Sequence, residues 1–242
     1  MSYVGLKHLL AELALAAVQQ PGDAGWPPVA AAYAALAADA THRPVRRTEL
    51  LKRAAALARP PAPAPSNAEI DLLIARGLLA AQDDGSVALT DAFLPYAAYL
   101  ERQAPRLLDA LAELRRPAAT AATPAVRIGA ALFNARLFFE CHEWFEAVWK
   151  ATTGPRRDLY QGIVQAAAAF YHFEKGNAHG CATLMRKARA RLAPYPSHVA
   201  GVDLGRFASG LAQWDAHFTG GPRPRAFPTL GLLPRSDRAR KE

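Results

Sequence analysis

Apolar positions recur every three to four residues along almost the whole chain, with polar positions between them. This is the period of the α-helix. The intervening stretches are rich in proline, glycine and asparagine, which favour turns. The pattern therefore predicts a mainly α-helical fold. The predicted helices are 4–19, 28–40, 48–58, 67–76, 91–114, 124–151, 156–175, 178–192 and 203–218.

One segment in the first half, residues 72–91, departs from the helical period. Apolar residues up to Leu79 are followed by the turn sequence Asp83-Asp84-Gly85 and then by a short apolar run that ends at Thr90. This order predicts a helix, two short strands joined by a turn, and a helix whose N-cap is Thr90. With the two helices before it, the segment resembles a winged helix-turn-helix over about residues 28 to 115.

The side chains of this module do not favour DNA recognition. Its reading helix would present Asn67, Glu69, Asp71 and Arg76, and the turn would present Asp83 and Asp84. Carboxylates repel phosphates, whereas recognition uses basic and amide side chains. A basic cluster lies instead on the supporting helix and its approach, at Arg43, Arg46, Arg47, Lys52 and Arg53. We therefore favour a packing or dimerisation role, which makes a homodimer one expectation.

A proline- and alanine-rich stretch at residues 115–123 is typical of an interdomain linker. It predicts a winged-helix-like domain with a small β-hairpin at residues 1–118. An antiparallel helical bundle would follow at residues 119–220 and a basic, disordered tail at residues 221–242.

The net charge of the 242-residue chain is +8, and the second half carries all of it. Residues 1–118 hold 12 Lys and Arg against 12 Asp and Glu, while residues 119–242 hold 17 against 9. About half of the excess follows Gly221. Such an end either associates weakly with nucleic acid or serves as a solubilising extension. We favour the second interpretation.

Three observations predict a cytoplasmic protein with no membrane association. No apolar run reaches the roughly 18 to 20 residues of a membrane span, and residues 1–19 read as a folded amphipathic helix that carries Lys7, His8 and Glu12. The two cysteines, Cys141 and Cys181, lack metal-ligand spacing and indicate a reducing setting. Because Cys141 and His142 are adjacent, their side chains diverge on a helix, which argues against thiol catalysis.

The predicted helix 124–151 contains a stripe of ionisable and aromatic residues. At about 100° per residue, His142, Glu146 and Trp149 share one face, with Glu143 beside them. The rest of this stripe is apolar, so we expect it to face the interior. Asn134 lies at the other edge of the stripe.

The predicted helix 156–175 carries a matching stripe in which Gln165 and His172 are separated by alanines. Small side chains let helices approach closely. We therefore expect His142, Glu143 and Glu146 to meet Gln165 and His172 inside the bundle. This set suits a divalent metal held by His142, Glu146 and His172, or acid–base catalysis by Glu143, His142 and His172. The zincin and di-iron spacings are absent, and a purely structural network is the alternative.

These residues resemble the family called domain of unknown function 309. The resemblance begins at Phe133-Asn134 and Phe138-Phe139-Glu140-Cys141-His142-Glu143 and continues through Tyr160-Gln161-Gly162-Ile163-Val164-Gln165 and Gly176-Asn177 to Asp203. It covers about residues 125 to 218. It implies an all-helical bundle of prokaryotic origin and no particular activity. The positions that match the family motif are Asn134, Glu140, His142, Glu143, Glu146, Trp149, Gln165 and His172.

Two classes of function follow from these residues. The first is a metal-dependent or acid–base hydrolase that acts on a small molecule. In it the set above would hold metal or move protons, and Asn134, Glu140, Trp149 and Gln165 would line the ligand site. The second is a non-enzymatic regulatory or scaffold protein that binds a small ligand, a protein partner or, less favoured, nucleic acid.

Overall fold

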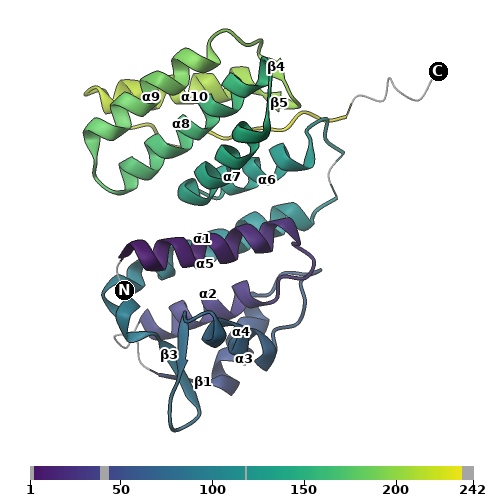
Figure 1. Ribbon diagram of the computed structural model, residues 1–242, viewed down its shortest axis with the longest axis vertical. Helices are drawn as coiled ribbons and strands as arrows, with labels where there is room; N and C mark the ends of the chain where they lie inside the picture. The colour runs from purple at the N-terminus through teal and green to yellow at the C-terminus, as the bar shows by residue number, and fades with distance from the viewer. Residues whose placement is uncertain (1–2, 39–43, 118, 236–242) are drawn as a thin grey trace, which may run out of the picture. The chain divides into compact units, whose positions relative to one another are not determined.

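The structure is a computed structural model that describes residues 3–38, 44–117 and 119–235. The chain divides into two compact units, Met1–Arg116 and Pro117–Glu242. Helices dominate both units and the sheets are small, which confirms the mainly α-helical prediction (Figure 1). No helix in the described ranges has the length and apolarity to cross a membrane. Arg43 of the predicted basic cluster and residues 236–242 of the predicted tail lie outside these ranges.

The N-terminal unit is organised around α2, which contacts α3, α4 and α5, while α1 packs on α5. Its side chains from Trp26 to Ala34 are all buried, so this helix forms the centre of the core. The helices are α1 (Tyr3–Gln19), α2 (Trp26–Ala38), α3 (Arg47–Leu57), α4 (Asn67–Ala75) and α5 (Ala97–Arg115). A 3₁₀ turn, η1 (Asp91–Tyr96), contains Pro95 and precedes α5, so the predicted helix 91–114 is not α-helical throughout.

The predicted hairpin is present in this unit. Strands β2 (Leu79–Ala81) and β3 (Ser86–Leu89) pair antiparallel, and the short β1 (Val45–Arg46) adds to the other edge of β3. Gly85 takes a positive φ of 79° in the connecting turn, a conformation that glycine adopts without strain. The winged-helix interpretation of this arrangement stays a prediction.

The C-terminal unit is organised around α8, which packs against α7 on one side and α9 on the other. Its core is a cluster of rings in mutual contact, contributed by Phe133, Phe138, Phe170, Phe207, Trp214 and Phe227. The helices are α6 (Pro124–Asn134), α7 (Phe138–Ala151), α8 (Arg156–Glu174), α9 (Ala178–Leu192) and α10 (Leu204–Phe218). A two-stranded hairpin, β4 (His198–Val199) and β5 (Val202–Asp203), precedes α10.

The predicted helix 124–151 is broken into α6 and α7, which corrects the sequence analysis. Arg136 takes a positive φ of 61°. The Arg136 N–H donates to Phe133 O at 2.9 Å and the Leu137 N–H donates to Leu132 O at 3.0 Å. This pair of hydrogen bonds is the Schellman motif that ends a helix. Glycine is the usual residue at such a positive φ. Here the Arg136 guanidinium makes a tertiary contact, 4.7 Å from the Phe227 ring centroid.

Residues 221–235 pack on the C-terminal unit, which corrects the prediction that the disordered tail starts at residue 221. Phe227 stacks on Trp214 with ring centroids 4.6 Å apart, and Leu230 is fully buried. The Asn134 amide binds the backbone of Leu230 in both directions, donating at 3.2 Å and accepting at 2.7 Å. Asn134 thus fastens this segment to the end of α6.

Candidate functional site

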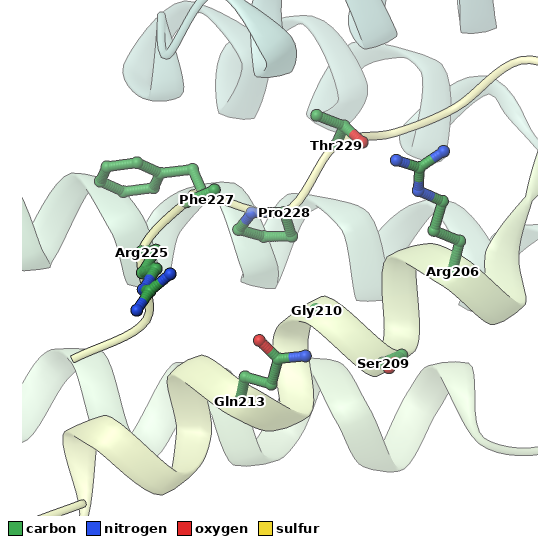
Figure 2. A pocket seen from close by; sticks show the side chains of 9 residues that line it. Arg206, Ser209, Gly210, Gln213, Arg225, Phe227, Pro228 and Thr229 are labelled. Atoms are coloured by element: carbon green, nitrogen blue, oxygen red, sulfur yellow. The ribbon is translucent and has the colours of Figure 1, made fainter. Parts of the chain in front are cut away.

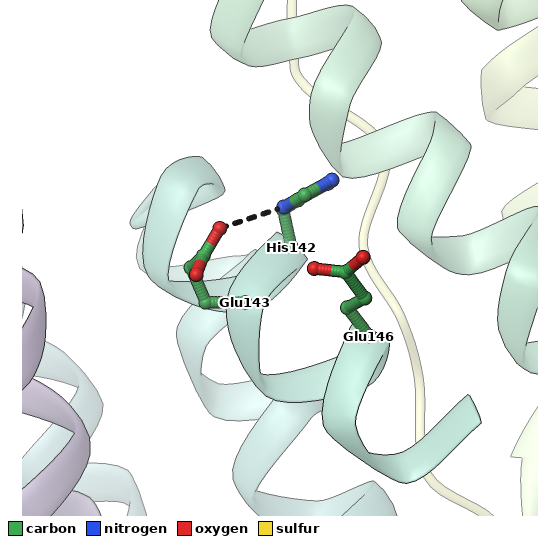
Figure 3. Close-up of side chains that lie close together, drawn as sticks. All are labelled: His142, Glu143 and Glu146. Carbon is green, nitrogen blue, oxygen red and sulfur yellow. Dashed lines mark hydrogen bonds and ion pairs between the residues drawn. The ribbon is translucent and has the colours of Figure 1, made fainter. Parts of the chain in front are cut away.

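Three ionisable side chains of α7 gather at one place. His142, Glu143 and Glu146 each offer one ligand atom, and these atoms all lie within 4.8 Å of one another. His142 Nδ1 lies 3.2 Å from Glu143 Oε1, and the Glu146 carboxylate is directed toward the same imidazole (Figure 3). We call this group the His–Glu cluster.

The cluster sits at the edge of the unit and not in its interior. The side chains of His142, Glu143 and Glu146 are 29%, 35% and 31% exposed. These side chains are therefore partly exposed, whereas they were expected to lie in the interior. The reason is that the buried face of α7 is filled by other residues, namely Phe138, Phe139, Glu140, Cys141 and Phe145. The cluster occupies the flank that remains, where water and solutes can reach it.

One cation accompanies the cluster. Lys150 Nζ lies 3.1 Å from Glu146 Oε1 at the i,i+4 spacing, and its side chain is 63% exposed. Lys150 was not among the predicted site residues, although the i,i+4 spacing from Glu146 is a familiar signal of a helical ion pair. The exposed ammonium is mobile and hydrated, so it offsets one carboxylate weakly.

Gln165 lies on the stretch of α8 that packs along the part of α7 carrying the cluster. The two helices run antiparallel, as the contacts Phe139–Tyr171 (5.4 Å) and Phe145–Tyr160 (6.0 Å) show. His142 and Gln165 both lie between these two contacts along their helices. Gln165 Oε1 is buried and has no hydrogen-bond partner among the described residues. The expected meeting of Gln165 with His142, Glu143 and Glu146 stays a prediction.

His172 does not join the His–Glu cluster, contrary to the predicted metal set. Its Nδ1 lies 2.9 Å from Asn177 Nδ2, and Asn177 Oδ1 accepts from the Gly180 N–H at the start of α9. An extra Cβ on Gly180 would come within 2.7 Å of the His172 ring. His172 therefore belongs to the turn that joins α8 to α9.

Trp149 and Glu140 bound the region on α7 without entering the cluster. The Arg157 guanidinium lies 4.7 Å from the Trp149 ring centroid and donates to Trp149 O at 3.1 Å, so the end of α7 is tied to the start of α8. Glu140 is only 1% exposed, on the opposite, buried side. Burial raises the pKa of the Cys141 thiol well above its usual value, and the Glu140 carboxylate raises it further, which leaves Cys141 a neutral core residue.

Comparison with known proteins places the cluster inside a recognised segment. Residues 126–184 match the family model described as Domain of unknown function (DUF309). This confirms the resemblance over residues 126–184, and this matched segment contains the whole cluster. An "Uncharacterized protein" of Aquifex aeolicus (strain VF5) is 28% identical over 82 residues, which make up 34% of this chain. The chain spans only a quarter of that relative, 25% of its length. No solved structure matches.

Proposed function

We propose that the helical unit that matches domain of unknown function 309 binds a divalent transition-metal ion at the His–Glu cluster and uses it for hydrolysis of a small molecule. The observation that carries this proposal is the convergence of one imidazole and two carboxylates within 4.8 Å on a partly exposed face. Imidazole and carboxylate are ligands of zinc, manganese, iron and nickel.

The electrostatics of the cluster support a cation there. Glu143 and Glu146 lie one helical turn apart, and like charges at this spacing destabilise a helix. A divalent ion would neutralise both carboxylates, which the exposed Lys150 cannot do. Metal ions in this role bind neutral imidazole, so protons compete with them for His142.

The number of protein ligands supports the proposed hydrolytic role. Three protein ligands leave coordination positions for water, as in catalytic metal sites, whereas structural sites are usually closed by four. A metal lowers the pKa of bound water and so supplies a nucleophile near neutral pH. The partial exposure of all three side chains supports access for a small substrate.

A metal-free acid–base site is the second candidate, and the 3.2 Å contact between His142 Nδ1 and Glu143 Oε1 favours it. A carboxylate that accepts from an imidazole orients the ring and stabilises its protonated form, so the other ring nitrogen can move a proton. Both candidates need His142 and Glu143. They differ in their dependence on Glu146 and on a metal.

The test is metal analysis and titration of protein prepared without a histidine tag. We expect the wild-type chain to bind one equivalent of zinc or manganese, and His142→Ala and Glu146→Gln to weaken that binding by about a hundredfold or more. His179→Ala, at an exposed histidine of α9, is the matched control and should leave binding unchanged. Less than about a tenth of an equivalent, with no saturable binding on titration, would refute the metal site.

An activity measurement then separates the two candidates. Hydrolysis of simple phosphate and carboxylate esters should be abolished by a chelator and restored by the metal if the ion is required. Activity that survives chelation but is lost in Glu143→Gln would instead assign acid–base catalysis. Absence of hydrolysis in protein that binds metal stoichiometrically would limit the proposal to metal binding.

A further inference from the structure

A pocket of about 590 Å³ lies between α10 and the segment of residues 221–235, and no residue of the His–Glu cluster lines it. The part of this segment that lines the pocket is residues 225–229, and the opposite wall is α10 from Arg206 to Gln213 (Figure 2). Small-molecule sites typically occupy about 300–1,000 Å³. We call this feature the α10 pocket.

Gly210 determines the shape of the pocket. A Cβ at this position would come within 2.7 Å of Pro228 Cβ. Only glycine therefore lets the segment lie this close to α10. The anchors on either side are the stacking of Phe227 on Trp214 and the burial of Leu230. The pocket is thus bounded by fixed backbone.

Two arginines line the pocket, one from each wall. Figure 2 shows Arg206 rising from α10 toward Thr229 and Arg225 directed from the segment toward α10, at opposite ends of the groove. Neither guanidinium has a hydrogen bond, ion pair or ring contact with any described residue. Their neighbour Arg223 differs, because its guanidinium lies over the rings of Phe173 (5.4 Å) and Trp214 (5.9 Å).

The other lining groups suit an anion that also needs hydrogen bonds. Ser209 and Thr229 bring hydroxyl groups, and Gln213 brings an amide that points into the pocket in Figure 2. The carboxylate of Asp203 is already engaged, because its Oδ1 accepts from the Arg206 N–H at 3.0 Å. The helix N-terminus is therefore capped, and the positive charge available to a ligand comes from the two side chains.

We propose that the α10 pocket binds a small phosphorylated compound with two anionic groups, one held by each arginine. A guanidinium binds phosphate through two parallel hydrogen bonds, and this geometry is specific to arginine. The placement of the two charges at opposite ends selects a ligand with separated anionic groups over a single phosphate. The pocket lies outside residues 126–184, so it is independent of the proposed metal function.

The test is calorimetric titration of the full chain in low salt, with a chelator present so that the His–Glu cluster holds no metal. The probes are orthophosphate, pyrophosphate and tripolyphosphate. We expect saturable binding that is tightest for tripolyphosphate and weakest for orthophosphate. Arg206→Gln and Arg225→Gln should each weaken tripolyphosphate binding by about tenfold or more, the usual loss for one charge-assisted hydrogen-bonded contact.

Arg186→Gln is the matched control, because Arg186 is an exposed arginine of α9 outside the pocket. It should keep wild-type affinity, and all three variants should keep the wild-type melting temperature, since each side chain is exposed. Absence of saturable binding, or equal weakening by all three variants, would overturn the proposal. Tighter binding of a short oligothymidylate that also depends on Arg206 and Arg225 would overturn it in favour of a nucleic-acid backbone.

Discussion

Both units carry exposed ion pairs, but the C-terminal unit also has charged side chains that these pairs do not account for. In the N-terminal unit, acidic groups pair with individual arginines across the surface. Examples are Arg47–Asp71 (2.7 Å), Arg59–Asp109 (2.9 Å) and Arg76–Glu12 (2.8 Å). The C-terminal unit has such pairs too, Arg189–Asp215 and Arg191–Asp158 (2.7 Å). It also gathers two carboxylates around one histidine beside an exposed lysine, and two arginines line its pocket with no acidic partner among the described residues.

This difference separates charges that serve solubility from charges that can serve binding. An exposed ion pair contributes only about 0–1 kcal/mol to stability, so the N-terminal pairs need no further explanation. Like charges brought together lower stability unless an opposite charge joins them. The two carboxylates of the His–Glu cluster are such a group, and we assign a metal ion to them. To the two arginines at opposite ends of the α10 pocket we assign an anionic ligand.

The largest expected effect concerns Cys141, which reports how tightly the C-terminal unit is closed. Because burial and Glu140 raise the pKa of its thiol, little reactive thiolate forms at neutral pH. Labelling by a thiol reagent should be at least about a thousandfold slower than in unfolded protein, since it requires opening of the unit. Labelling of Cys141 in native protein as fast as in unfolded protein would contradict this core.

Phe170→Ala should be the most destabilising substitution of the C-terminal unit, by about 3–5 kcal/mol. Phe170 is fully buried and contacts four other aromatic rings of the core. Tryptophan fluorescence during urea unfolding measures this effect, because three of the four tryptophans, Trp144, Trp149 and Trp214, lie in this unit. Phe173→Ala, at a part-buried ring, should cost less. A smaller effect at Phe170 would mean that the ring cluster is not the core.

Gly129→Ala should destabilise the same unit by about 1–3 kcal/mol, the usual cost of overpacking. A Cβ on Gly129 would come within 2.2 Å of the Phe145 ring, so α6 and α7 would have to separate. Gly22→Ala is the control, because nothing lies within 4 Å of the added atom. Thermal unfolding of the two variants gives the comparison, and an unchanged melting temperature for Gly129→Ala would show that α6 does not pack on α7 as described.

The smallest effects test the contrast between the units directly, because their signs are opposite. In metal-free protein, Glu143→Gln should stabilise by about 0.2–0.5 kcal/mol, since it removes one of two like charges. Asp109→Asn removes the partner of Arg59 and should destabilise by about 0–1 kcal/mol. Urea midpoints measured at low ionic strength resolve the signs. A loss of stability in both variants would mean that the cluster is an ordinary, satisfied surface network.

Helix ends show how far the sequence could predict the fold. Gly77 and Gly176 both take positive φ values, 75° and 69°, just after α4 and α8. Glycine is the usual residue there, so these ends were predictable within a residue or two. The end of α6 has the same hydrogen bonds around Arg136. Nothing local marks it, because the ring that contacts Arg136 is Phe227, which lies far along the chain.

The candidate site was predictable where its residues share one helix, because their spacing determines which of them lie on the same face. The spacing of His142, Glu143 and Glu146 on α7 predicted their convergence. The contribution of His172 depended on the rotation of α8 and on the turn after it, where Asn177 engages its ring. The packing of residues 221–235 could not be predicted either. Their arginine-rich composition suggests solvent exposure, but Phe227 and Leu230 anchor them to the unit.

The central claim is that the His–Glu cluster holds a metal ion, and anomalous diffraction from a crystal grown with zinc or manganese tests it most directly. We predict one strong anomalous peak at about 2.0–2.2 Å from a His142 ring nitrogen and from carboxylate oxygens of Glu143 and Glu146. The peak should disappear in crystals of Glu146→Gln. A map with no peak at the cluster, while His142 and Glu143 remain hydrogen-bonded to each other, would contradict the account.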